Sequence, residues 1–423
     1  MSTAGTSAPA PTSELKRLAT TPAVMCLMLF SAAYITNAMD RSIFATLLPM
    51  ISKHYGYELK TGGFLATIFN LGIGFAGLPT GYLLDRWSRK SVLSLGMIIY
   101  SVATLATILA VAVPDMAIYR AITGVGEGMQ IAALYVAAGS YFYKNKAFVV
   151  GCINVGYGIG TVIGPRWGVH LALTAGNWKN PFVVFCVLGL VMAAAVWFII
   201  PRSFSEQKAI SPAQDKTIVV DNIPENFFNR NIKLLIFSVF VLGTVGYGYM
   251  GLYVSFLVKQ LHYSPAAAAA AFSFYGFGCM LPMLGGWLGD RFSNRGAVVI
   301  AWGAQAVILY LIFNVATQPA TQSLLTFLQG FFYSSTCHVN HLALFQRSVR
   351  PGMVGRSTGL FTSTHFLSGA FAGYLMGALA TKFGWGTAAL IQETMLCVCA
   401  MLVILAINPK LQLSVKHKLA GGH

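Results

Sequence analysis

The chain carries one short motif in each of its two halves. The stretch GYLLDRWSR, Gly81–Arg89, recurs as GWLGDRFSN, Gly286–Asn294. Asp85 and Arg86 of the first copy align with Asp290 and Arg291 of the second. Each copy follows the second long apolar segment of its half. An internal repeat of this kind is typical of membrane proteins built from two related helical halves.

The composition around these copies is that of a membrane protein. Hydrophobic residues make up 56% and charged residues 9% of the 423 residues, and the mean hydropathy is +0.67. Soluble domains carry about 25% charged residues, so a soluble fold is excluded. Apolar runs of the roughly 20 residues that span a bilayer lie near 23–51, 61–84, 90–113, 116–141, 147–173, 181–200, 233–258, 264–289, 297–316, 322–346, 357–380 and 386–408. We therefore predict an all-α membrane protein with twelve transmembrane helices in two six-helix pseudo-symmetric bundles.

The basic residues are distributed as membrane topology requires. The formal net charge is +16, and most Lys and Arg fall in alternate loops that include both chain ends. The opposite loops hold Lys53, Lys60, Lys179, Lys259 and Lys382. Because positive loops stay in the cytoplasm, we predict a multi-pass protein of the cell inner membrane with both termini cytoplasmic. This pattern explains the charge without a nucleic-acid partner.

A loop of mixed charge and proline content separates the halves. It predicts a cytoplasmic linker at 201–232 between an N-terminal bundle at 23–200 and a C-terminal bundle at 233–408. Cytoplasmic tails are expected at 1–22 and 409–423. We expect a monomer in the lipid bilayer.

The first motif resembles the signature of the major facilitator superfamily. Gly81, Leu83, Asp85, Arg86, Arg89 and Lys90 match that signature, and Ser88 replaces its usual glycine. RAITGVGEG, Arg120–Gly128, resembles the fourth-helix motif of the superfamily, and the resemblance covers residues 23–408. It implies a secondary transporter that works by alternating access.

A finer resemblance comes from charged residues within the helices. Asp40-Arg41, Arg120 with Glu127, and GGWLGD in the eighth span resemble the anion:cation symporters, which carry organic anions with protons. Spinster-type lipid transporters share a similar pattern. Tyr157 departs from it, because it falls near a position that is often Gln in sugar-acid carriers.

Three of these charges are candidates for proton coupling. A charged group within the membrane is costly and tends to face the bundle interior or a cavity. Arg120 and Glu127 are seven residues apart, about two turns on one helix face, so Arg120 can hold Asp40 ionised while Glu127 exchanges a proton. Burial favours the neutral form of a carboxyl group, as a proton carrier requires. The alternative is a structural ion pair without transport chemistry.

Substrate-binding candidates lie in three spans. Arg41 and Arg166 carry the planar guanidinium that binds a carboxylate through two hydrogen bonds, and Tyr157 lies in the fifth span with Arg166. His338, His341 and Asn340 give the tenth span a polar face. Snorkelling to the headgroups is the alternative for Arg166, and packing is the alternative for the histidines. The His-x-x-His pair lacks a carboxylate partner, so we expect no metal.

The motif copies are candidates for gating. Gly81, Asp85, Arg86, Arg89, Asp290 and Arg291 lie near helix ends. Charge-assisted contacts between helices there would have to break as the halves rock.

Together these patterns predict a proton-coupled symporter of a small organic anion, a carboxylate. The alternative is an exporter or exchanger of an amphipathic lipid or drug, for which apolar residues of the second half would line the cavity. Neither a soluble catalytic domain nor a Walker lysine is present in the sequence, so we predict no enzyme and no cofactor.

Overall fold

The computed structural model describes residues 18–142, 146–206, 218–219, 223–412 and 414–415. Most of the expected tails and part of the expected linker lie outside these residues. The described chain is almost entirely helical, and its one pair of strands is β1 (Ile218–Val219) antiparallel to β2 (Ser414–Val415). The predicted fold class is confirmed.

Helices of the first half follow the apolar runs. They are α1 (Thr20–Tyr55), α2 (Leu59–Thr67), α3 (Phe69–Arg86), α4 (Arg89–Thr107), α5 (Val113–Tyr141), α6 (Lys146–Thr174), α7 (Asn180–Ile199) and the short α8 (Arg202–Ser205).

Helices of the second half are more broken. They are α9 (Arg230–Lys259), α10 (Pro265–Cys279), α11 (Pro282–Arg291), α12 (Asn294–Asn314), α13 (Pro319–Gly330), α14 (Val339–Arg347), α15 (Val354–Gly369), α16 (Ala372–Phe383), α17 (Trp385–Ala389) and α18 (Leu396–Leu405). Two π-helices, η2 (Phe331–His338) and η4 (Leu390–Met395), connect α13 to α14 and α17 to α18. The 3₁₀ turns are η3 (Pro351–Met353) and η5 (Pro409–Leu411).

Proline accounts for one of these breaks. Helices α10 and α11 meet at a 45° bend just before Pro282, which has no N–H to donate to the preceding turn. Eight of the described helices are long and apolar enough to cross a membrane alone, and nine spans result if the bent pair counts as one. The segments near 147–173, 322–346 and 357–380 are helical, but none forms one helix that is both long and apolar enough to be counted as a membrane span. The count of twelve therefore stays a prediction.

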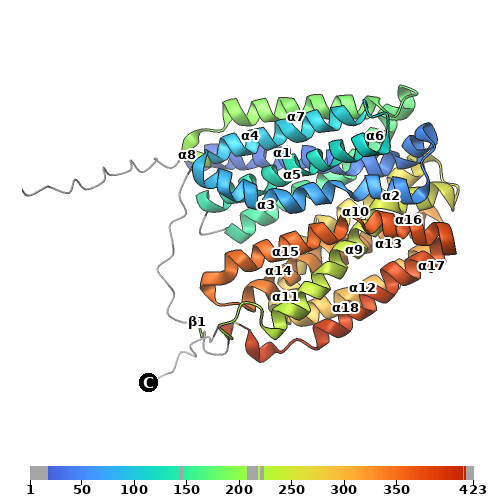
Figure 1. The fold of residues 1–423 in the computed structure, drawn as a ribbon. Coiled ribbons are helices and arrows are strands. Elements are labelled where there is room, and N and C mark those ends of the chain that lie inside the picture. The colour runs from blue at the N-terminus through green and yellow to red at the C-terminus, as the bar shows by residue number, and fades with distance from the viewer. Residues whose placement is uncertain (1–17, 143–145, 207–217, 220–222, 413, 416–423) are drawn as a thin grey trace, which may run out of the picture.

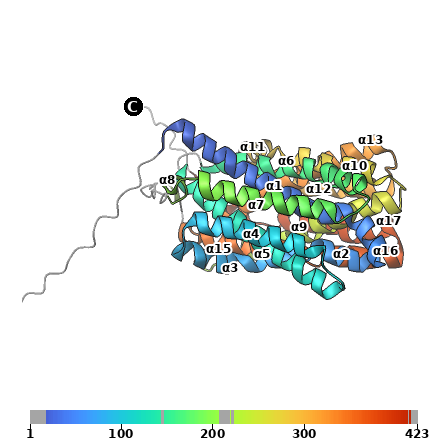
Figure 2. The same ribbon diagram turned by 90° about the horizontal axis from the view of Figure 1, so that it is seen from above.

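The helices form two bundles that run along one axis (Figures 1 and 2). Helices α1 to α7 form the first bundle, and α9 to α18 form the second. We call the end that carries the α3–α4 and α11–α12 turns the signature end, and the other the far end. In Figure 1 the two bundles touch toward the far end, where α2 meets α16, and separate toward the signature end.

The far-end contact is made between backbones. A Cβ atom on Gly63 of α2 would lie 2.1 Å from the carbonyl oxygen of Gly373 on α16, so glycine alone permits this approach. Nearby, the Thr67 hydroxyl donates to the Ala370 carbonyl over 2.9 Å. At the signature end, Gly81 and Gly355 have nothing within 4 Å of an added Cβ. The bundles are therefore in backbone contact at the far end, whereas Gly81 and Gly355 have no such contact at the signature end.

The substitution Gly63→Ala tests this contact. We expect substrate uptake to fall at least tenfold, because the added methyl group overlaps the Gly373 carbonyl and forces the bundles apart. Gly303→Ala on α12 is the matched control, since its Cβ would lie 3.4 Å from the flexible Met401 sulfur. Equal uptake by the two variants in proteoliposomes would rule out the far-end contact as a moving interface.

The serines of the two motif copies begin the helices that follow. The Ser88 hydroxyl accepts from Ser91 N at 3.1 Å and caps α4, and Ser293 caps α12 in the same way. The serine in place of the usual glycine thus has a structural reason. Glu206 adds a second cap, because its carboxylate accepts from the backbone N–H groups of Arg89 and Lys90 at 3.0 and 3.2 Å.

The expected gating residues fall into two groups. Asp85, Arg86, Asp290 and Arg291 are exposed, in keeping with bundles that are apart at this end. Arg89 instead donates to the Ser205 carbonyl of α8 at 3.4 Å, within its own bundle. Its described contacts fix the α3–α4 turn to α8, so a role for Arg89 between bundles stays a prediction.

Candidate functional site

Four charged side chains lie buried inside the first bundle. Asp40 and Arg41 come from α1, Arg120 and Glu127 come from α5, and none is more than 6% exposed. The other buried residues of α1 and α5 are uncharged, and they include polar side chains such as Asn37 and Gln130. A group of this kind is costly to bury unless its members compensate one another.

An ion pair joins the two helices at this group. Arg41 Nε lies 2.9 Å from Glu127 Oε2, while Glu127 Oε1 has no hydrogen-bond partner among the described residues. One turn earlier on α1, Asn37 Oδ1 accepts from Arg41 Nη2 at 3.3 Å and Asn37 Nδ2 donates to Gln130 Oε1 at 2.8 Å. Arg41 is thus held between a carboxylate and an amide.

Asp40 points to a different neighbour. Its Oδ2 accepts from the Thr104 hydroxyl of α4 at 2.8 Å, and its Oδ1 has no partner within the described chain. Adjacent residues on a helix point about 100° apart. This geometry agrees with the expectation that Asp40 and Arg41 do not pair with each other.

Of the four buried charged side chains, Arg120 has the fewest hydrogen-bonding contacts. Its guanidinium lies between two rings, 4.7 Å from the centroid of Phe44 and 5.1 Å from that of Phe69. None of its three nitrogen atoms has a hydrogen-bond partner in the part of the chain that is described, although Asp40 and Glu127 are near enough to interact electrostatically. The expected link to Asp40 is therefore electrostatic and includes no described hydrogen bond.

Aromatic rings lead from Arg41 into the second bundle. Arg41 Cζ lies 5.8 Å from the Phe69 ring, which contacts Tyr247 of α9 at 6.0 Å. Tyr247 in turn lies 5.5 Å from His365 of α15, and His365 lies 5.1 Å from His338 of η2. Tyr157 also borders Arg41, with its ring 5.9 Å from Cζ. The ion pair and the imidazoles thus lie on one continuous path across the bundle interface.

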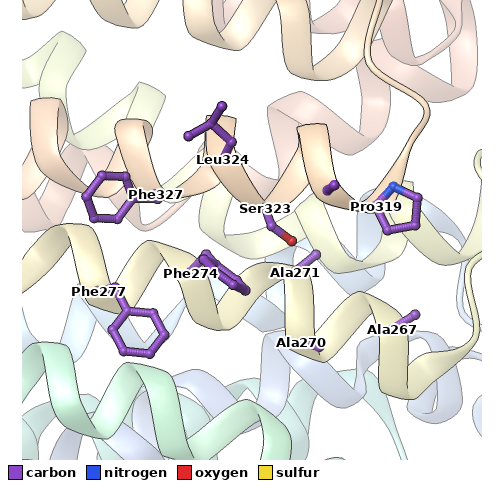
Figure 3. A pocket seen from close by; sticks show the side chains of 10 residues that line it. Ala267, Ala270, Ala271, Phe274, Phe277, Pro319, Ser323, Leu324 and Phe327 are labelled. Atoms are coloured by element: carbon purple, nitrogen blue, oxygen red, sulfur yellow. The ribbon is translucent and has the colours of Figure 1, made fainter.

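The second bundle also has a groove of about 900 Å³ between α10 and α13 (Figure 3). Its lining is apolar apart from Ser323 and comprises Ala267, Ala270, Ala271, Phe274, Phe277, Pro319, Ala320, Ser323, Leu324 and Phe327. In Figure 3 Phe327 comes from α13, and Phe274 and Phe277 come from α10 beside it. No charged side chain lines the groove.

Sequence comparison places this geometry in a family. The family model described as Major Facilitator Superfamily matches residues 30–284 and again residues 235–420. The chain belongs to the major facilitator superfamily. The predicted transporter class is confirmed, and members of this superfamily are membrane transporters, as opposed to enzymes.

Superfamily relatives of similar length include organic-acid transporters. A hexuronate transporter of Bacillus subtilis is 24% identical over 90% of this chain and 93% of its own length. The 4-hydroxybenzoate transporter PcaK of Acinetobacter baylyi is 22% identical over 78% and 82%. A sphingosine-1-phosphate transporter of Xenopus tropicalis is 23% identical over 83% and 72%. The suspected likeness to anion and spinster-type transporters is confirmed.

Solved superfamily structures share the fold. A bacterial homologue of the lysosomal transporter spinster, in an inward-facing and unoccupied conformation, aligns with TM-score 0.68 at 17% identity over 92% of this chain and 96% of its own. The nucleoside transporter NupG aligns with TM-score 0.72 at 12% identity over 92% and 100%.

Two of the predicted substrate-binding residues, Asn340 and His341, already have hydrogen-bond partners within the protein. The Asn340 amide donates to the Gly285 and Thr336 carbonyls at 2.9 and 2.8 Å, and its Oδ1 accepts from Asn294 at 2.7 Å. His341 is fully buried, with Nε2 2.8 Å from the Ser238 hydroxyl and Nδ1 2.9 Å from the Cys337 carbonyl oxygen. These bonds use the atoms that a substrate would need, so the packing interpretation accounts for both residues.

The other predicted ligands are placed differently. Arg166 is exposed, and its described contact is the Phe274 ring 5.8 Å away on α10 of the other bundle, so its role in substrate binding stays a prediction. His338 faces His365, and sequence analysis did not select His365. A lone histidine among small and apolar residues gave no spacing signal that could have identified it.

A further carboxyl group, Glu393, lies buried in η4 of the second bundle. It is fully buried, and neither of its oxygen atoms has a hydrogen-bond partner among the described residues. The described ionisable groups that interact with it electrostatically are Tyr249 of α9 and Cys397 of α18, neither of which is a cation. An ionised Glu393 without a partner would cost several kcal/mol of stability in this buried position. The uncharged carboxylic acid therefore fits the position.

We therefore expect Glu393→Gln to preserve both thermal stability and uptake. The amide has nearly the shape of the neutral acid and replaces no ion pair. Melting temperature in detergent and uptake in proteoliposomes, each compared with wild type, measure the two effects. A large loss of stability would indicate that Glu393 is ionised and paired.

Proposed function

We propose that the chain is a proton-coupled symporter of a small organic anion, a carboxylate, that works by alternating access. The observation that carries this proposal is the buried pair of Arg41 and Glu127, 2.9 Å apart with Glu127 Oε1 unpartnered. Organic acids are also what the hexuronate and 4-hydroxybenzoate transporters carry by name.

The charges of the group suggest how the two solutes are coupled. Two carboxyl groups and two guanidinium groups balance when all are ionised. A proton on Glu127 removes one negative charge and weakens the hold on Arg41, which is then free to bind a carboxylate. Asp40 is the second candidate to take a proton, and Arg120 supplies a permanent positive charge. Binding of the anion therefore favours protonation, and protonation favours binding of the anion.

We further propose that the signature end is cytoplasmic, as the distribution of Lys and Arg predicts. The structure then represents the state that is open to the cytoplasm, in the inner membrane of a cell, with both termini on that side. Transport would rock a bundle at 23–200 against a bundle at 233–408 across the linker at 201–232. One chain holds all four buried charges, so a monomer suffices.

Uptake into proteoliposomes tests the proposal. Labelled sugar acids, aromatic acids and monocarboxylates are offered with an inward proton gradient, and again with the gradient collapsed by a protonophore. Symport predicts that the gradient stimulates uptake of one class at least several-fold and that the interior acidifies in step with it. Uptake that ignores the gradient would contradict proton coupling, and absence of all carboxylate uptake would contradict the substrate class.

A second candidate function is export or exchange of an amphipathic lipid or drug. The observation that favours it is the apolar groove between α10 and α13 together with Arg166 over Phe274 at its edge. An apolar wall beside a cation suits a molecule with an apolar tail and an anionic head. Flux of a fluorescent lysophospholipid, lost in Phe274→Asp and not inhibited by carboxylates, would favour this function.

A further inference from the structure

We propose that the second bundle binds the ring of an aromatic carboxylate with a polar ring substituent, through His365 and Tyr333. This inference rests on the proposed function and narrows its substrate class. The site has two parts, in which the first bundle would hold the carboxylate and the second would hold the ring.

Two polar atoms of the second bundle face the aromatic cluster without partners. His365 is 3% exposed and Tyr333 is 5% exposed. Neither His365 Nδ1 nor the Tyr333 hydroxyl has a hydrogen-bond partner among the described residues. Their rings are 6.3 Å apart. Because buried polar groups are almost always satisfied, two such atoms in one cluster indicate a ligand group that donates and accepts, as a phenolic hydroxyl does.

The surroundings of these atoms are aromatic. His365 lies 5.1 Å from His338, 5.2 Å from Phe366 and 5.5 Å from Tyr247 between ring centroids, and its ring stacks on that of Phe361. His338 and Phe366 are only half-buried, so the cluster has an accessible face. Ring pairs with centroids 4.5 to 7 Å apart are favourable, so a benzene ring can join this cluster at little cost.

The position of the cluster matches the proposed carboxylate site. Tyr247 links His365 to Phe69, and Phe69 contacts both Arg41 and Arg120. We infer that a molecule with its carboxylate at Arg41 and its ring at His365 would contact both bundles. The faces of these rings are apolar, whereas a sugar acid presents several hydroxyl groups that would each lose water on contact with them. The chemistry favours the aromatic acid.

Selectivity between two probes tests this inference. The Michaelis constants of benzoate and para-hydroxybenzoate are measured for wild type, Tyr333→Phe and His365→Phe, with glucuronate as a third probe. Wild type should prefer the hydroxylated acid by about tenfold, the effect of one hydrogen bond. Each variant keeps a ring and loses the polar atom, so the preference for the hydroxylated acid over benzoate should fall toward one.

A buried tyrosine elsewhere in the bundle serves as the control. The Tyr249 hydroxyl donates to Thr326 Oγ1 at 3.2 Å, so Tyr249→Phe loses a packing hydrogen bond and should leave the preference unchanged. Gradient-driven uptake of glucuronate that benzoates do not inhibit would overturn the inference and leave the proposed function intact. An unchanged preference in both variants would also overturn it. Failure to transport either benzoate would likewise overturn the inference, whereas the proposed function fails only if no carboxylate of the wider panel is taken up.

Discussion

Glu127→Gln is expected to abolish accumulation of substrate driven by a proton gradient while preserving exchange of substrate for substrate. The glutamine cannot release a proton, and it resembles the protonated acid, so Arg41 stays free to bind an anion. Gradient-driven uptake should fall more than tenfold. Counterflow into vesicles preloaded with unlabelled substrate should remain within about threefold of wild type and should lose its dependence on pH.

The control for this effect is Glu393→Gln, which removes the buried carboxyl group of the other bundle. It should keep gradient-driven uptake, because Glu393 has no described cationic partner whose availability it could control. A Glu127→Gln variant that still concentrates substrate along a proton gradient would disprove the coupling role of Glu127. Loss of exchange as well as accumulation would instead favour a structural ion pair.

Of the single substitutions at the buried charged residues, Arg41→Met should lower the free energy of unfolding most. Removal of the guanidinium leaves the Glu127 carboxylate buried without its 2.9 Å partner. Breaking a buried pair in this way costs about 3–5 kcal/mol in the free energy of unfolding. The double variant Arg41→Met with Glu127→Met should regain most of that stability, because no charge is left unpaired, but it should not transport. Thermal unfolding in detergent and proteoliposome uptake measure the two properties.

Arg120→Met is the matched comparison for Arg41. Arg120 has no hydrogen-bond partner among the described residues, so its loss breaks no described bond and should reduce stability less. If the double variant remains as unstable as Arg41→Met, the instability comes from lost packing around the side chain, and the ion pair is not its cause.

The sequence predicts the helical fold well, and predicts the site in part. Hydrophobic run length and the two motif copies suffice for the fold class, because the bilayer requires long apolar helices. Charge inside a span suffices to select Asp40, Arg41, Arg120 and Glu127, because such residues are rarely tolerated elsewhere. The structure brings these four together.

The second bundle was harder to predict for a physical reason. Its polar residues are neutral, and a neutral side chain inside a helix can face packing, lipid or ligand at similar cost. Asn340 bonds to Gly285 of α11 and His341 to Ser238 of α9, whereas His365, one span away, faces His338. The partner of a neutral group depends on how α14, α15 and η2 turn about their axes. The π-helical geometry of η2 changes that rotation, and sequence periodicity does not reveal it.

Among the described residues, the buried guanidinium groups are those of Arg41 and Arg120. Both lie in the first bundle, although each bundle carries a copy of the same sequence motif. The duplicated halves have thus become chemically specialised. Such a division makes the protein modular in evolution. If the proposed roles hold, side chains on α15 and η2 can change and so alter which substrate is accepted, while the charged group of α1 and α5 that would couple transport to protons stays as it is.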